Sequence, residues 1–266
     1  MISKPLFMRE LKSNYKILLI FMVVMSLYIS VVIAMFDPSI GDSFKMMAEA
    51  MPDLFAAFGM TAFSSVLIEF LAEVLYGFIL IVIPLVFLVL LSNKLIGRYV
   101  DRGSMAYLLA TPNTRRKIVT TQAIFSITAN LCLVVFMIVL GIIVSGILFP
   151  GHLEIGKFLI VNFGLYTLLL FLSGLCFCSS CWFSDLKFSY GIGAGLCILF
   201  VVLKMLGQVS KDSKVFSYMT PITLFEPEKL IQFDHMAIAK AIILLVGGLI
   251  FYLIGILRFE RKDLSI

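Results

Sequence analysis

The chain has 266 residues, of which 61% are hydrophobic and 14% charged, and its formal net charge is +5. A soluble domain carries about 25% charged residues, so this composition excludes an ordinary soluble protein. The length leaves room for one membrane domain but not for a second soluble domain of ordinary size. The chain is therefore predicted to be an all-α integral membrane protein.

Six apolar runs are long enough to cross a bilayer, since a spanning helix needs roughly 20 residues. In chain order they are about Ile17–Phe36, Val74–Leu91, Ile118–Phe149, Phe158–Phe183, Phe188–Leu206 and Ala237–Leu257. The third run is longer than one straight crossing requires, so we expect it to begin in the cytoplasm or to tilt strongly. The first run ends without a small-residue cleavage site and is predicted to be a retained anchor.

The basic residues give the orientation. They concentrate in the N-terminal segment 1–16, in the connection 94–117 and in the C-terminal tail, whereas the connection 37–73 has Lys45 as its only base. Because basic loops stay in the cytoplasm, both termini are predicted to be cytoplasmic. The positive charge then forms a rim that faces the membrane, and no nucleic-acid partner is expected.

The two long outer connections have patterns of their own. Apolar residues recur at near-helical spacing in 37–73, which predicts short amphipathic helices in the outer interface, one of them starting at Pro52. These helices are interpreted either as an outer gate or as a cover for the edge of the bundle. The connection 207–236 contains Pro221 and Pro227 with aromatic residues around them, which predicts a rigid turn that is re-entrant or lies on the surface.

The sequence contains no catalytic or nucleotide-binding constellation. A phosphate-binding loop ending in Gly-Lys-Ser/Thr is missing, and the two histidines, His152 and His235, are far apart in outer segments. The middles of the six runs lack carboxylates, lysines and arginines, which proton- or sodium-coupled carriers use. We therefore predict a transport subunit, not an enzyme, with no metal or cofactor of its own and an energy source outside the bilayer.

The cytoplasmic segment Lys94–Lys117 is the most informative part of the chain. Its middle can form a short helix with Met105, Leu108 and Leu109 on one face. Gly103 permits a turn before this helix, and Pro112 ends it. An apolar face of this kind at a membrane surface indicates a protein partner. Taken alone, the segment is also compatible with a basic loop that holds a short interfacial helix.

These residues resemble the cytoplasmic signature of bacterial type-2 ABC permeases, the membrane subunits of ATP-driven exporters. That signature runs approximately acid-x-Gly-Thr-Leu-Glu-x-Leu-Leu-Ser-x-Pro-x-Ser-Arg. The matching positions are Asp101, Gly103, Ser104, Leu108, Leu109, Pro112, Thr114 and Arg115, while Ala106 and Tyr99 stand where acids are common. Three further stretches resemble the family: Leu6–Lys12 its amphipathic elbow, Met51–Gly59 an outer segment, and Arg258–Leu264 its terminal Phe-x-x-Arg-Asp-Leu pattern.

The resemblance implies a type-2 ABC exporter transmembrane domain in the bacterial cytoplasmic membrane. Segment 1–16 would be the elbow, and 94–117 would be a coupling segment seated on a separate ATP-binding subunit that holds ATP and magnesium. The coupling residues would be Asp101, Arg102, Gly103, Ser104, Met105, Leu108, Leu109, Pro112, Arg115 and Arg116. A second permease, identical or different, would complete the pathway. The first and fifth spans are expected at that interface, the fifth through Gly191 and Gly195, whose spacing lets helices approach closely.

The apolar spans favour a hydrophobic or amphipathic substrate, such as an antimicrobial peptide, a drug or a lipid-like molecule. The alternative is a non-transporting membrane partner with an immunity or sensor role. A membrane-embedded enzyme is disfavoured because the ionisable groups that it needs are missing. The sequence assigns no substrate-contact residue, and membrane lipid is an expected partner of any such chain.

Overall fold

The computed structural model describes residues 2–36, 50–51, 66–97, 99, 114–209 and 219–262. Six helices in these ranges are long and apolar enough to cross a membrane. They are α1 (Lys4–Ala34), α5 (Ile79–Ser92) continued by the π-helix η1 (Asn93–Gly97), α8 (Arg115–Leu148), α9 (Ile155–Trp182), α10 (Leu186–Val209) and α13 (His235–Glu260). Three short helices accompany them: α4 (Leu67–Val74), the 3₁₀-helix η3 (Pro221–Leu224) and α12 (Pro227–Ile231). The predicted all-α fold with six helices long and apolar enough to span a membrane is confirmed, whereas the type-2 exporter topology and the cytoplasmic termini stay predictions.

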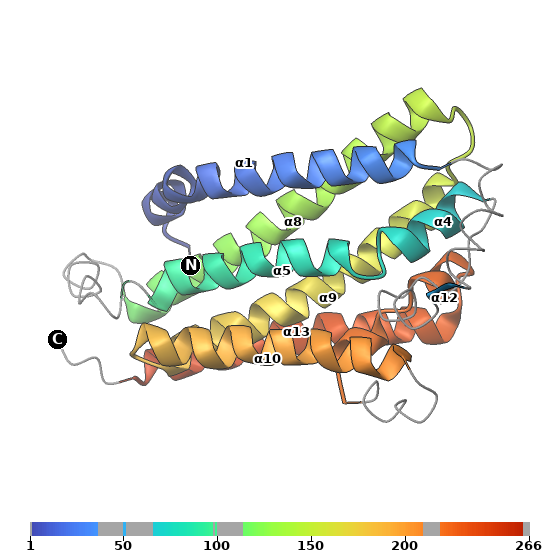
Figure 1. Ribbon diagram of the computed structural model, residues 1–266. Coiled ribbons are helices and arrows are strands. Elements are labelled where there is room, and N and C mark those ends of the chain that lie inside the picture. Colours follow the sequence, from blue (N-terminus) through green and yellow to red (C-terminus); the bar gives the residue numbers. More distant parts are fainter. Residues whose placement is uncertain are drawn as a thin grey trace.

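The long helices form a bundle in which α1 packs mainly against α8, while α10 and α13 each pack against α9. Figure 1 shows α8 crossing the bundle obliquely. Helix α9 is central and packs most extensively against α13. We call the end where α1 begins and α13 ends the terminal end, and the end that holds α4 and α12 the distal end.

Short polar side chains begin several of the helices. The Thr114 hydroxyl accepts a hydrogen bond from the Lys117 N–H at the start of α8. The Asp234 carboxylate accepts one from the Met236 N–H at the start of α13, at 3.1 Å. Such caps satisfy backbone N–H groups that have no partner in the first helical turn. The capping residues Thr114 and Asp234 therefore determine where α8 and α13 begin.

Glycines bring α9 and α13 into close contact. A Cβ added at Gly174 would lie 2.6 Å from the carbonyl oxygen of Gly248, and one added at Gly255 would lie 3.2 Å from the Cα of Cys178. Small residues at such positions let the two backbones approach, which is how helices pack where lipid removes the hydrophobic driving force. The central packing of the bundle depends on these glycines.

The second span differs from the prediction of one run over Val74–Leu91. Helix α4 ends at Val74, four residues turn, and α5 begins at Ile79. Across the turn the N–H groups of Tyr76 and Leu80 each donate to a carbonyl five residues earlier, at 3.4 and 3.2 Å. This widened pattern interrupts the helix, and the prediction of a continuous helix was wrong here.

The first and third spans extend toward the terminal end beyond their apolar runs. Segment 1–16, predicted as the elbow, supplies the first turns of α1, and the ribbon changes direction near that start (Figure 1). Helix α8 has 34 residues, about 51 Å at 1.5 Å per residue, against roughly 30 Å of bilayer core. Its oblique course agrees with the expected extension or tilt. The part of 37–73 around Pro52 lies outside the described residues.

Candidate functional site

The predicted coupling segment is described only at its two flanks. Arg115 and Arg116 lie in the first turn of α8, Arg115 half-buried and Arg116 exposed. The other predicted coupling residues, Asp101, Arg102, Gly103, Ser104, Met105, Leu108, Leu109 and Pro112, lie outside the described residues. The short coupling helix therefore stays a prediction. The flanks show what the segment is attached to.

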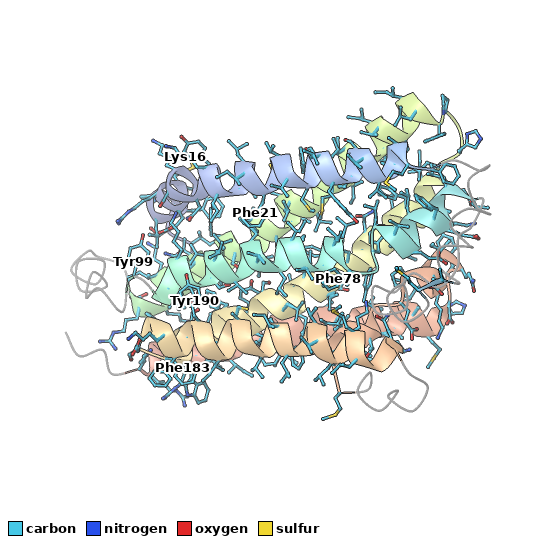
Figure 2. All side chains as sticks on the ribbon, in the orientation of Figure 1. Lys16, Phe21, Phe78, Tyr99, Phe183 and Tyr190 are labelled. Carbon is cyan, nitrogen blue, oxygen red and sulfur yellow. The ribbon has the colours of Figure 1, made fainter. Side chains whose placement is uncertain are left out.

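The upstream flank is tied to the first turns of α1. The Tyr99 hydroxyl donates to the Glu10 carboxylate at 2.8 Å, and the Arg9 guanidinium lies over the Tyr99 ring, 5.8 Å from its centroid. One turn earlier, the Lys94 ammonium donates to the Ser13 carbonyl at 2.9 Å. Figure 2 shows Tyr99 at the terminal end of the bundle. These contacts therefore join Lys94 and Tyr99 to the first turns of α1.

Glu10 connects three parts of the chain. Its side chain is only 1% exposed. In addition to the bond from Tyr99, its carboxylate accepts hydrogen bonds from the amides of Asn14 and Gln122, both at 3.2 Å. Gln122 belongs to α8, so one buried carboxylate joins α1, α8 and the start of the coupling segment. We call Glu10, Asn14, Tyr99 and Gln122 the terminal polar cluster.

The downstream flank is tied to the last residues of α9 and α13. The Arg115 guanidinium donates to the carbonyl of Lys262 at 2.9 Å. The Lys262 ammonium in turn donates to the carbonyl of Cys181 at 3.2 Å. Burial lowers the pKa of Lys262 from the ordinary lysine value of 10.5. Beside this contact, the Arg258 guanidinium lies 4.9 Å from the Trp182 ring centroid.

The π-helix η1 links the same region to α9 and α10. The Asn93 side-chain oxygen accepts a hydrogen bond from the Ser189 hydroxyl of α10 at 2.6 Å, and the Ser180 hydroxyl of α9 lies 3.4 Å away. All three side chains are buried. A π-helical turn at the end of a span is a feature that often accompanies functional sites. Displacement of η1 would reach α10 through these bonds.

Charge is distributed unequally between the two ends of the bundle. Among the described residues, the terminal end carries Lys4, Arg9, Lys12, Lys16, Lys94, Arg115, Arg116, Lys117, Lys187, Arg258, Arg261 and Lys262 against Glu10, Asp185 and Glu260. The distal end carries Glu69, Glu73, Glu154, Glu226, Glu228 and Asp234 against Lys157, Lys204, Lys229 and Lys240. The terminal end is thus a cationic surface that suits acidic protein surfaces and anionic lipid headgroups.

The terminal polar cluster was missed in the sequence. Glu10 and Asn14 are four residues apart, so they share a face of a helix, and Gln122 is a polar residue next to a long apolar run. The spacing of Glu10 and Asn14 and the position of Gln122 indicate that these polar side chains are buried. The same features do not identify Tyr99, whose contact with Glu10 joins residues far apart in the chain.

Within the part of the chain that the structure describes, no three histidine, cysteine or acidic side chains are close enough to hold a metal ion. Comparison with protein-family models and with curated proteins found no match to this chain.

Proposed function

We propose that this chain is the permease subunit of an ATP-driven exporter of the type-2 ABC class, coupled through segment 94–117 to a separate ATP-binding subunit. The resemblance of this segment to the family signature carries the proposal. Six membrane-length helices and the cationic terminal end support it. In this proposal the terminal end faces the cytoplasm of a bacterial cell, as the positive-inside rule expects.

The anchoring of both flanks supports a mechanical role for the segment. The upstream flank bonds to α1 through Lys94 and Tyr99, and the adjoining Asn93 of η1 bonds to α9 and α10. The downstream flank bonds to the residues that follow α13 through Arg115 and Lys262. A force applied between the flanks therefore reaches most of the bundle through hydrogen bonds rather than through one loop. When the ATP-binding subunits close on ATP and displace the segment, these hydrogen bonds would transmit the displacement to the spans.

Assembly with a second permease is part of the same proposal. Helices α1 and α10 leave most of their apolar windows exposed. On α10, a Cβ at Gly191 or Gly195 would meet nothing within 4 Å. The small-residue face that was expected to pack against a helix has no neighbour within the described chain, so it is open to a second copy. Blue-native sizing that finds only one permease per purified complex would contradict this part.

The direct test is complex formation. The chain is co-expressed with the ATP-binding subunit encoded beside it, purified through a tag on the permease, and the ratio of the two proteins is measured. We expect a stable complex for the wild type and its loss in Leu108→Asp/Leu109→Asp, because charge at a buried apolar anchor removes the central contact. The matched control is Met219→Asp, which changes an apolar side chain that is 61% exposed on the connection before α13.

Two results would contradict the proposal. If the wild type binds no ATP-binding subunit, the chain lacks the energy source of an exporter, and the immunity or sensor role becomes the better interpretation. If the double variant binds as well as the wild type, segment 94–117 is not the coupling site. The Met219→Asp complex shows whether a loss in the double variant is specific to that segment.

A further inference from the structure

A cavity of about 590 Å³ lies at the distal end of the bundle. This volume falls within the roughly 300–1,000 Å³ that small-molecule sites occupy. Its lining comes from three places: the turn between α4 and α5, the last turns of α10, and the segment from η3 to α13. The lining includes Gly77 and the charged residues Lys204, Lys229, Lys240, Glu226 and Glu228.

The interrupted second span meets the cavity at Gly77. In a continuous helix the Ile81 N–H would bond the Gly77 carbonyl, but here it donates to the Phe78 carbonyl at 3.1 Å. The Lys204 ammonium donates to the Gly77 carbonyl instead, at 3.2 Å. Backbone outside a helix is tolerated at membrane depth where it lines a cavity or is buried in protein. Figure 2 shows Phe78 farther toward the distal end than Tyr99.

Lys204 has no charge partner among the described residues. No carboxylate of those residues lies within ion-pair distance of its ammonium group, which donates a hydrogen bond to a neutral carbonyl. The described cavity wall has two carboxylates, Glu226 and Glu228. Glu226 already faces two ammonium groups, Lys240 at 2.9 Å and Lys229 at 3.3 Å. A cation removed from water is stabilised by an anion and by further hydrogen bonds. The cavity therefore favours an anionic group beside Lys204.

An apolar crevice adjoins the cavity and shares Gly77 and Lys204 with it. Its other walls include Phe78 and Val82 of the second span and Val201 of α10. The crevice encloses only about 10 Å³, so a hydrocarbon chain would lie along it and not inside it. The cavity holds three lysines against two glutamates, and two of these lysines pair with Glu226, so Lys204 is the cation available to a ligand. A cavity of this kind that continues into an apolar strip matches a molecule with an anionic head and one apolar tail.

We propose that this cavity binds the anionic headgroup of a single-chain amphiphile, with Lys204 contacting a phosphate or carboxylate and the tail lying along Phe78, Val82 and Val201. That the amphiphile is a transported substrate rests on the proposed function. The binding itself does not, because it uses residues of one chain and needs no ATP-binding subunit. Failure of binding would leave the coupling test unchanged, and failure of coupling would leave the binding site in place.

The test is native mass spectrometry of the purified chain in a neutral detergent. Dodecyl phosphate, dodecanoate, the zwitterion dodecylphosphocholine and inorganic phosphate are added in separate samples. We expect one retained dodecyl phosphate or dodecanoate per chain, with dodecylphosphocholine and inorganic phosphate binding at least about tenfold more weakly, since a charge-assisted bond and the apolar tail both contribute.

Four variants isolate the role of Lys204. Lys204→Gln keeps a donor for the Gly77 carbonyl but removes the charge, and we expect it to bind dodecyl phosphate at least about tenfold more weakly. Lys204→Arg keeps the charge and is expected to bind, so it gives an answer if the glutamine variant fails to fold. Glu226→Gln frees Lys229 and Lys240 and is expected to bind more tightly. The control is Lys157→Gln, a distal lysine that pairs with Glu154 at 2.8 Å away from the cavity lining.

Three outcomes would overturn the proposal. Equal binding of dodecyl phosphate to Lys204→Gln and to the wild type would show that Lys204 serves only the Gly77 carbonyl. Equal binding of dodecylphosphocholine would show that the head charge is not recognised. Tight binding of inorganic phosphate alone would assign an anion site and not an amphiphile site.

Discussion

Replacement of Glu10 by alanine tests whether the terminal polar cluster holds the coupling segment. The variant removes a buried carboxylate that accepts hydrogen bonds from the Tyr99 hydroxyl and the Gln122 amide. Asn14 is affected less, because its amide also donates to the Glu10 backbone carbonyl at 2.8 Å. The substitution therefore mainly affects the contacts that join α1 to α8 and to residue 99.

The expected loss follows from the two hydrogen bonds removed, both of which the Glu10 Oε1 atom accepts. A donor that loses its acceptor on burial costs roughly 1–3 kcal/mol, so the free energy of unfolding should fall by about 2–6 kcal/mol. For a chain of this size, that corresponds to a Tm lowered by roughly 5–15 °C. Tyr99→Phe removes one of the same bonds and should cost about 1 kcal/mol. Because the two side chains are in contact, the double variant should lose less than the sum of the single ones.

The chain offers its own reporter for this assay. Cys176, Cys181 and Cys197 are buried, whereas Cys132 is exposed and Cys178 is partly exposed. In a Cys132→Ser/Cys178→Ser background, a thiol-reactive dye labels the protein as it unfolds, and the labelling midpoint gives the Tm. The control is Glu260→Ala at the same end, whose carboxylate forms no hydrogen bond with the described residues. A Glu10→Ala midpoint within about 1 °C of the wild type would refute the role given to Glu10, since even one lost acceptor predicts more.

Two further predictions concern packing and pH. Gly174→Val should prevent stable folding, because its Cβ alone would lie 2.6 Å from the Gly248 carbonyl oxygen. Gly191→Val, on the open face of α10, should leave the folded monomer intact and weaken dimers. Thiol labelling measures the first effect and blue-native sizing the second, and a stable Gly174→Val monomer would contradict the close contact of α9 and α13. Burial lowers the pKa of Lys262 below its ordinary 10.5. Between the lowered value and 10.5 the unfolded chain holds a proton on Lys262 that the folded chain lacks, so the contribution of Lys262 to the free energy of unfolding should rise with pH across that window. In Trp182 fluorescence melts over an alkaline series, the stability of the wild type should therefore increase relative to that of Lys262→Met, since all other titrating groups are common to the two proteins.

The long spans could be predicted because apolar runs fix helices in lipid. The fourth run, predicted as Phe158–Phe183, corresponds to α9 over Ile155–Trp182, and the sixth corresponds to α13. In both, the backbone must satisfy its own hydrogen bonds within the segment, so length and composition decide the structure. Helix ends shifted by a few residues because caps such as Asp234, and not the apolar run, set them.

The interruption of the second span could not be predicted. The only proline of that run, Pro84, lies inside α5 without ending it, while the turn occurs at Leu75–Phe78. The Gly77 carbonyl is satisfied by Lys204, which is distant in sequence. The same reason hid the terminal polar cluster, since Glu10 depends on Tyr99 and Gln122 from other elements. The local pattern of apolar residues therefore predicts the helices, whereas the polar cluster and the interruption depend on contacts between residues that are far apart in the sequence.

The most direct test of the central claim is the ATP hydrolysis rate of the purified complex in nanodiscs. The wild type, Leu108→Asp/Leu109→Asp and the control Met219→Asp are compared at equal permease concentration. The account predicts a rate that falls at least about tenfold in the double variant and stays near the wild type in Met219→Asp, because only the former changes the apolar anchor. Equal rates in all three complexes would contradict coupling through segment 94–117.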